Sequence, residues 1–410
     1  MQDRMVVRDG CIRRLREGRG HPTLVKIIGS IGKCGTTTVL EQFAAELVAS
    51  GVPEDDVVLI RLDEPENSGI LTREDLAVLV SERLSGSEHG VLIIDGIQRI
   101  PEWDRFALSV CTKGTWDLYV CGTGGHMVAS GIRSSVTVRS VEIWLPPLSF
   151  HEYYTLHGDL GTPDEVLGLY MRYGGMPVVD PSMGGRRCDI ILRGLVSSIM
   201  MADIAGRQMT PNATTAMKVA YHLFSEIGSP VNMMSVSKGT GISQNTVEKY
   251  IVSLVDNGVF RYARRYDLRD GRTPKTNGRF YAEDLGQCRT VLSRDVPAQP
   301  AAENLAFMEL CRRGCDVVIG NDGEEDLGLL AAGDGARTLY AVVDGDGSGM
   351  EAWAERAGNA AGGIPLAILA TRRGGPASVG RAKVLNLTDW LLDDGCDPRV
   401  VDAPAEWHEL

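Results

Sequence analysis

The sequence predicts a multidomain α/β protein whose front third is a parallel sheet built around a phosphate-binding turn. Two observations predict this class. Between residues 24 and 121, short apolar runs alternate with stretches in which apolar residues recur at helical spacing, the pattern of strands joined by crossover helices. The chain also has 410 residues, more than one compact domain usually holds. We therefore expect a parallel sheet that binds its ligand at the carboxyl ends of the strands.

Composition and charge exclude several classes of protein. Hydrophobic residues make up 43% of the chain and charged residues 23%, which is typical of a globular protein. No apolar run reaches the roughly 18 residues that a membrane span needs. The nine cysteines include no C-x-x-C pair, which argues against a zinc ribbon. We expect a cytoplasmic protein with reduced thiols and no membrane partner.

The first predicted strand and helix enclose a glycine-rich loop. Leu24–Ile28 is a short apolar run, and the helical pattern of Val39–Val48 follows it. The candidate nucleotide-binding residues lie in and beside the loop: Gly29, Gly32, Lys33, Cys34, Gly35, Thr36, Thr37 and Thr38. A P-loop uses backbone N–H groups to surround phosphate oxygens, a lysine to reach the β- and γ-phosphates, and a Ser/Thr hydroxyl to ligate Mg²⁺. Thr37 occupies the hydroxyl position, but Thr36 occupies the lysine position and Lys33 lies three positions before it.

A second buried strand predicts the other half of a nucleotide site. Val91–Ile94 is apolar and ends in Asp95, which is how a Walker B strand delivers a carboxylate to Mg²⁺. Asp95 and Thr37 are therefore the candidate magnesium ligands. An ATPase of this type normally places a glutamate next, to orient or deprotonate the attacking water, and this chain has Gly96 there. The motif by itself also fits a buried strand that ends in a capping aspartate.

Residues from about 25 to 392 resemble, in order, a prokaryotic AAA+-type ATPase family that carries a C-terminal domain of unknown function. The resemblance rests on the P-loop segment, on Ile94–Trp103, on Pro147–Tyr153 and on the turn Tyr173–Pro177. It implies a bound nucleotide, ATP with Mg²⁺, and it places the family's trans-acting arginine at Arg139. An arginine that acts in trans further implies an oligomer.

The chain departs from the family where the chemistry lies. The family's P-loop lysine corresponds to Thr36, its catalytic glutamate to Gly96 and its polar sensor residue to Gly124. Each loss should lower the rate of hydrolysis on the order of a hundredfold or more. We therefore expect an ATP-binding pseudoenzyme with weak or lost hydrolysis. Two alternatives stay open: an active ATPase that uses Lys33 as its lysine, and a nucleotide-independent adaptor that binds DNA or protein.

The resemblance and the helical patterns together divide the chain into five expected parts. They are an N-terminal segment (1–20), an AAA+-like P-loop domain (21–145), a helical lid or linker (146–210), a winged helix-turn-helix domain (211–295) and a C-terminal α/β domain (296–410). In the fourth part, a helix, a glycine turn at Gly239–Gly241 and a second helix precede two expected wing strands. Candidate DNA contacts lie on the second helix and in the basic cluster of the wing: Lys249, Arg264, Arg265, Arg269, Arg272 and Lys275.

The last part is acidic and resembles restriction-endonuclease-like nucleases. From Asp295 to Leu410 it holds 20 Asp/Glu against 9 Lys/Arg. The resemblance implies that Glu303, Glu324 and Asp326 are remnants of a metal site, because nucleases of that fold bind Mg²⁺ with two or three carboxylates. A helix cap and a solvated strand edge explain the same residues without metal. Ala341 stands where the third polar residue of such a site would be, so we expect little cleavage from this domain.

Overall fold

The computed structural model describes residues 4–84, 88–123, 139–201, 212–274, 278–344, 347, 349–393 and 399–402. The chain forms two compact units. The first comprises residues 1–147, 256–258 and 397–410, and the second comprises residues 148–255 and 259–396. Throughout the described ranges, helices fall short of the length and apolarity that a membrane crossing requires.

The first unit contains a five-stranded parallel sheet, which confirms the predicted fold class. The strand order is β3-β4-β5-β2-β6, so the strand before the glycine-rich loop lies between β5 and β6. The strands are β2 (Val25–Ser30), β3 (Val57–Arg61), β4 (Gly90–Asp95), β5 (Trp116–Thr123) and β6 (Ser140–Leu145). The longer helices are α1 (Asp9–Glu17), α2 (Thr36–Ala49), α3 (Arg73–Arg83) and α4 (Trp103–Lys113).

Both faces of this sheet are buried, as the unbroken apolar strands predict. On one face, Ile27 and Ile94 pack with the apolar residues of α3 and α4. On the other face, Ile28 and Tyr119 pack with α1 and α2. Because successive side chains of a strand point to opposite faces, the neighbouring residues Ile27 and Ile28 belong to different hydrophobic cores. The covered faces leave the carboxyl ends of the strands as the place for a ligand.

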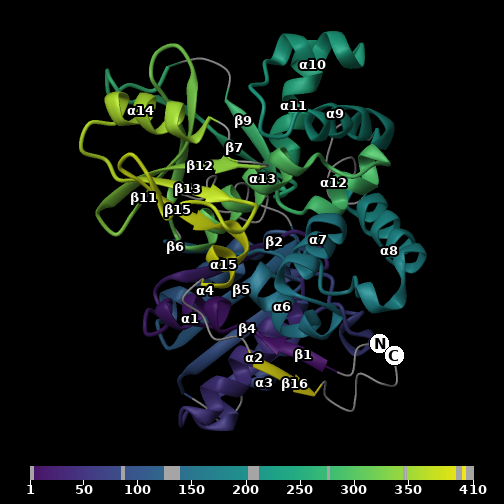
Figure 1. Ribbon diagram of the computed structural model, residues 1–410. Coiled ribbons are helices and arrows are strands. Elements are labelled where there is room, and N and C mark those ends of the chain that lie inside the picture. Colours follow the sequence, from purple (N-terminus) through teal and green to yellow (C-terminus); the bar gives the residue numbers. More distant parts are fainter. Residues whose placement is uncertain are drawn as a thin grey trace. The chain divides into compact units, whose positions relative to one another are not determined.

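Strands from the two ends of the chain pair beside this sheet. Figure 1 shows β1 (Arg4–Val7) next to β16 (Arg399–Asp402), and their register is antiparallel with Arg4 opposite Asp402. After β1, helix α1 buries Cys11, Ile12 and Leu15 against the first unit. The segment before β2 is therefore part of the packed unit.

The second unit begins with helices that glycines bring close together. These helices are α6 (Phe150–His157), α7 (Pro163–Tyr173), α8 (Gly185–Ser198) and α12 (Leu285–Leu292). At the end of α7, Gly174 has φ 76°, and a Cβ atom built on it would lie 2.3 Å from both carboxylate oxygens of Asp284. The next residue, Gly175, donates its N–H to Asp284 at 2.7 Å. The Gly-Gly pair of the turn is therefore required by the close approach of this buried carboxylate.

Three helices and a two-stranded ribbon follow. They are α9 (Ala213–Ser225), α10 (Met233–Thr240), α11 (Gln244–Asp256), β7 (Phe260–Ala263) and β9 (Arg279–Ala282). Gly241 ends α10 in the left-handed conformation, and β7 pairs antiparallel with β9, with Phe260 opposite Ala282. Two helices and two paired strands thus follow one another in the predicted order, but Gly239 and Thr240 of the predicted turn belong to α10.

The remainder of the second unit is a seven-stranded mixed sheet with the order β14-β15-β13-β12-β11-β10-β8. Its strands are β10 (Asp316–Asn321), β11 (Asp326–Gly333), β12 (Ala336–Val343), β13 (Leu366–Ala370), β14 (Ser378–Val379) and β15 (Ala382–Asn386). Its helices are α13 (Ala298–Arg312), α14 (Met350–Ala360) and α15 (Leu387–Leu392). The seventh strand, β8 (Arg265–Asp267), comes from the connection between β7 and β9 and pairs parallel with β10. The basic connection is therefore built into this sheet.

Candidate nucleotide site

The glycine-rich loop leads from the end of β2 into the N-terminus of α2. Lys33 has φ 67° and Gly35 has φ 85°, so two nearby residues adopt the left-handed conformation. For Lys33 this costs roughly 1–2 kcal/mol, and such a conformation persists only where the surrounding structure imposes it. Helix α2 begins at Thr36 directly after the turn. The unpaired N–H groups and the positive dipole end of the helix favour an anion at this place.

Thr37 and Asp95 lie together at the edge of the sheet. The Thr37 hydroxyl donates a hydrogen bond of 2.7 Å to Oδ2 of Asp95, which ends strand β4. Burial raises the pKa of Asp95, hydrogen bonds from Thr37 and Cys121 lower it in part, and the charge of Asp63 raises it further. A hydroxyl and a carboxylate are the hard oxygen donors that Mg²⁺ prefers. The pair would hold the metal of a nucleotide–Mg²⁺ complex, which would neutralise phosphate charge.

The side chain in the lysine position turns back into the loop. The Thr36 hydroxyl donates to the hydroxyl oxygen of Ser30 at 2.9 Å and lies 3.3 Å from Sγ of Cys34. The side chain in the lysine position therefore contacts other residues of the loop, whereas a lysine there would extend towards the phosphates. Lys33 itself is exposed. The loop therefore still leads into a helix N-terminus, but the position from which a P-loop lysine normally extends is occupied by Thr36.

The residue after Asp95 has a backbone that disfavours a glutamate. Gly96 has φ 82°, and its N–H donates to the carbonyl oxygen of Cys121 at 3.0 Å. A Cβ atom there would lie 3.4 Å from Leu62 Cβ and from Asp63 Oδ1, which is ordinary contact. The strain of a side chain at this position would come from the positive φ. The position at which the family places its glutamate therefore has a backbone conformation that a glutamate would adopt only with strain.

Arg8 is a residue of the site that the sequence analysis missed. The residue is 3% exposed, and its guanidinium donates to the carbonyl oxygens of Cys34 and Pro147, at 3.4 and 3.1 Å. Its backbone N–H donates to the side-chain oxygen of Gln42 on α2, at 3.2 Å. By binding the carbonyl of Cys34, Arg8 supports the loop from outside. Nothing in the local sequence indicates this contact, because it joins residues 26 positions apart.

The structure places the other predicted residues at separate points of the fold. Arg139 is exposed immediately before β6, and its carbonyl oxygen accepts the N–H of Val25 at 3.1 Å. Lys249 is exposed on α11. Gly124 and Lys275 lie outside the described residues.

The basic cluster between β7 and β9 contains exposed arginines and one partly buried arginine. Arg264, Arg269 and Arg272 are exposed. Arg265 instead donates from Nε to Asp326 at 2.6 Å, and its side chain is 23% exposed. Of the predicted metal remnants, Glu324 has a side chain that is 79% exposed and lies 3.4 Å from Arg356. The cluster therefore presents fewer charges to solvent than its sequence indicates.

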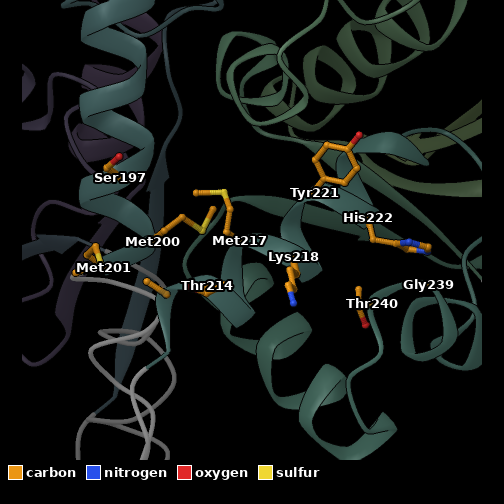
Figure 2. A pocket seen from close by; sticks show the side chains of 11 residues that line it. Ser197, Met200, Met201, Thr214, Met217, Lys218, Tyr221, His222, Gly239 and Thr240 are labelled. Atoms are coloured by element: carbon orange, nitrogen blue, oxygen red, sulfur yellow. The ribbon is translucent and has the colours of Figure 1, made fainter.

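A cavity of about 810 Å³ lies in the second unit between the end of α8 and helices α9 and α10. Figure 2 shows Met200 on one wall and Met217 on α9, with Lys218, Tyr221 and His222 along the same helix. Its described lining residues include no carboxylate and no glycine-rich turn at a helix start. Those residues offer neither a phosphate cradle nor a magnesium site, so the glycine-rich loop is the stronger candidate for nucleotide.

Two family models match parts of the chain. Residues 23–154 match the AAA domain, and residues 164–298 match a Domain of unknown function (DUF8612). The second match covers α7 to α12, the ribbon of β7 and β9, and strand β8. The sequence analysis instead expected the domain of unknown function at the C-terminal end of the chain, so the matched domain precedes the expected one. Together with the parallel sheet and the loop at its edge, the first match defines an AAA+-like P-loop domain.

One curated relative and several solved structures are similar to the chain. An uncharacterized protein of Haemophilus influenzae is 24% identical over 341 residues, which cover 81% of this chain and 85% of the relative. A DNA polymerase III gamma subunit-related protein of Thermotoga maritima has a TM-score of 0.27 at 11% identity, covering 60% of this chain and 99% of that one. The replication initiator DnaA, bound to AMPPCP and single-stranded DNA, has a TM-score of 0.23 at 12% identity, with coverage of 60% and 86%. Drosophila ORC bound to DNA has a TM-score of 0.25 at 10% identity, with coverage of 70% and 87%.

Proposed function

We propose that this protein binds ATP with Mg²⁺ at the glycine-rich loop, hydrolyses it weakly or not at all, and uses nucleotide occupancy to control binding of DNA or protein elsewhere in the chain. The observation that carries the proposal is the hydrogen bond between Thr37 and Asp95. The chain retains the magnesium-side pair and the helix N-terminus, which together suit a triphosphate–metal complex.

We infer weak hydrolysis from the two residues that occupy the lysine and glutamate positions of the family, Thr36 and Gly96. The lysine position is filled by Thr36, whose hydroxyl is engaged with Ser30. The base position is filled by Gly96 in the left-handed conformation. Positioned proton transfer alone contributes about 10²–10⁴-fold to a rate, so the loss of base and lysine together leaves little turnover.

Equilibrium binding of a fluorescent ATP analogue, with and without Mg²⁺, tests the proposal. We expect saturable binding that weakens in D95N and T37A, because each variant removes one oxygen donor to the metal. D104N is the matched control, since Asp104 lies in the first turn of α4 and takes no part in the loop. If the unaltered protein shows no saturable signal at millimolar nucleotide, the proposal is wrong.

Phosphate release distinguishes weak hydrolysis from the active-ATPase alternative. If Lys33 replaces the missing lysine, the unaltered protein turns over ATP and K33A abolishes the turnover. K113A serves as the control, because Lys113 is exposed at the end of α4. We expect release near the background rate in all three proteins.

Contact with DNA is proposed for the exposed arginines between β7 and β9. Arg264, Arg269 and Arg272 are exposed to solvent, where they could meet phosphates, although Arg269 also lies 3.8 Å from the carboxylate of Asp322. Binding through them is expected to be independent of sequence and to weaken steeply with salt. Retention of duplex DNA that does not change between low and high salt contradicts this assignment and favours a protein partner.

Arg139 is proposed to act on a neighbouring copy of the chain. Its exposure before β6 leaves the guanidinium accessible to a second subunit. Nucleotide-dependent oligomers that dissociate in R139A, observed by analytical ultracentrifugation, would support this role. The same distribution of masses in R139A and in the unaltered protein would exclude it.

A further inference from the structure

Glu303, Asp326, Arg265 and Arg279 form one cluster in the second unit. Glu303 lies on α13, Asp326 begins β11, and the arginines lie on β8 and β9. The side chains are 18%, 6%, 23% and 15% exposed in that order. The resemblance to nucleases assigns the two carboxylates to a divalent cation, so their bonding in this structure tests that assignment.

Both oxygens of Asp326 are fully engaged. Arg265 donates to Oδ1 from Nε at 2.6 Å, with its Nη2 at 2.5 Å from the same oxygen as an ion pair, and Asn321 donates to that oxygen at 3.1 Å. Arg279 donates to Oδ2 from Nη2 at 2.7 Å and from Nε at 3.2 Å. A carboxylate has about four lone-pair positions, and this one already accepts four hydrogen bonds. A cation would have to displace a guanidinium to bind Asp326.

Glu303 is held by the same network. Its Oε1 accepts from Nη1 of Arg279 at 3.0 Å and from the Tyr281 hydroxyl at 2.7 Å. One guanidinium therefore bridges the two carboxylates that a metal would bridge. Two carboxylates and two guanidiniums also make the cluster neutral, so adding Mg²⁺ would place two uncompensated charges in a largely buried place.

The titration behaviour of the cluster agrees with strong pairing. Burial opposes the charge of Asp326, but hydrogen bonds and charges from Arg279 and Arg265 prevail and hold its pKa below the usual range. Burial likewise lowers the pKa of Arg279, but the charge of Glu303 leads the interactions that raise it overall. Both shifts favour the charged forms of Asp326 and Arg279.

We propose that the guanidinium groups of Arg265 and Arg279 take the place of a divalent cation between Glu303 and Asp326, so that this part of the chain is an arginine-filled site that neither binds Mg²⁺ nor supports metal-dependent cleavage of nucleic acid. The arginines also fix the connection between β7 and β9 to the seven-stranded sheet. The inferred site is independent of nucleotide binding at the glycine-rich loop.

Mn²⁺ binding, followed by electron paramagnetic resonance of the free ion, tests this inference. All proteins carry D95N, which removes the magnesium-side carboxylate of the loop from the measurement. The D95N parent and the same protein with D326N added should bind equal amounts of Mn²⁺. The R265Q/R279Q variant should gain one Mn²⁺ per chain, and adding D326N should abolish that gain. R269Q/R272Q is the matched control, because it removes two exposed arginines from the same connection and should gain nothing.

Two results would overturn the inference. One is Mn²⁺ uptake by the parent that D326N abolishes, which would show a cation site despite the arginines. This measurement does not depend on whether R265Q/R279Q folds. The other is an R265Q/R279Q protein with the circular dichroism of the parent and no additional Mn²⁺, which would show that the carboxylates are not arranged for a cation.

Discussion

Replacing Gly96 places a side chain where the resembling ATPase family has its glutamate, and the structure predicts how much stability this change costs. Gly96 has φ 82°, a conformation that costs a residue with a Cβ atom roughly 1–2 kcal/mol. The nearest atoms to that Cβ, in Leu62 and Asp63, would lie at 3.4 Å, so no clash adds to this cost. We expect G96A to lower the free energy of unfolding by about 1–2 kcal/mol. G96E should lower it further, because its carboxylate would lie beside Asp63 and Asp95.

Urea denaturation of G96A, G96E and G96Q measures these differences, and phosphate release measures any gain in turnover. G51A is the matched control for stability, because Gly51 has φ 97° with no atom near its Cβ position. G96A and G51A should lose similar stability, and G96E should gain little turnover while Thr36 still fills the lysine position. A G96A protein as stable as the parent, or a G96E protein that hydrolyses ATP more than about a hundredfold faster, would refute this reasoning.

Three further predictions concern buried charges. Lys26 is fully buried and pairs with Asp117 at 2.6 Å, so K26M should lower the free energy of unfolding by about 3–5 kcal/mol, measured by urea denaturation. Burial raises the pKa of Asp284 to about 6, so its contribution to stability is complete below the unfolded pKa of about 3.9 and is lost as the pH rises through 6. Thermal melts between pH 4 and 7 should show this decline, and D284N should flatten it. R8Q should weaken nucleotide binding about tenfold by releasing the carbonyl of Cys34, whereas R8K should retain part of the affinity, measured by the same titration.

The parallel sheet could be predicted from the sequence because its signals are local. The apolar runs at Leu24–Ile28 and Val91–Ile94 correspond to β2 and β4, and both are buried on two faces. The proximity of Thr37 and Asp95 was expected from the same local signals. Asp95 ends β4, Thr37 follows the loop after β2, and the carboxyl ends of parallel strands lie at one edge of a sheet. The order of the strands was not predicted, because β2 pairs with β5 and β6, which lie far from it in sequence, and not with β3.

The features that could not be predicted depend on contacts between distant residues. Strand β8 has three residues, too few to give a pattern, and it pairs with a strand more than fifty residues later. The antiparallel pair of β1 and β16 joins the two ends of the chain. Arg265 and Arg279 belong to a basic stretch whose composition is typical of a phosphate-binding surface. Only the structure shows that both pair with Asp326 of the seven-stranded sheet.

At three places where the family resemblance assigns functional groups, this chain has contacts or a backbone conformation that oppose them. Thr36 stands in the lysine position and binds Ser30. Gly96 stands in the glutamate position with a backbone that a glutamate would strain. Arg279 bridges the two carboxylates that the resemblance assigns to a cation. If hydrolysis is weak as proposed, returning one group to such a site should restore little, because the reversion must also break a contact or strain the backbone. We therefore expect single reversions to restore little and combined ones, such as T36K with G96E, to restore more than the sum of their separate effects.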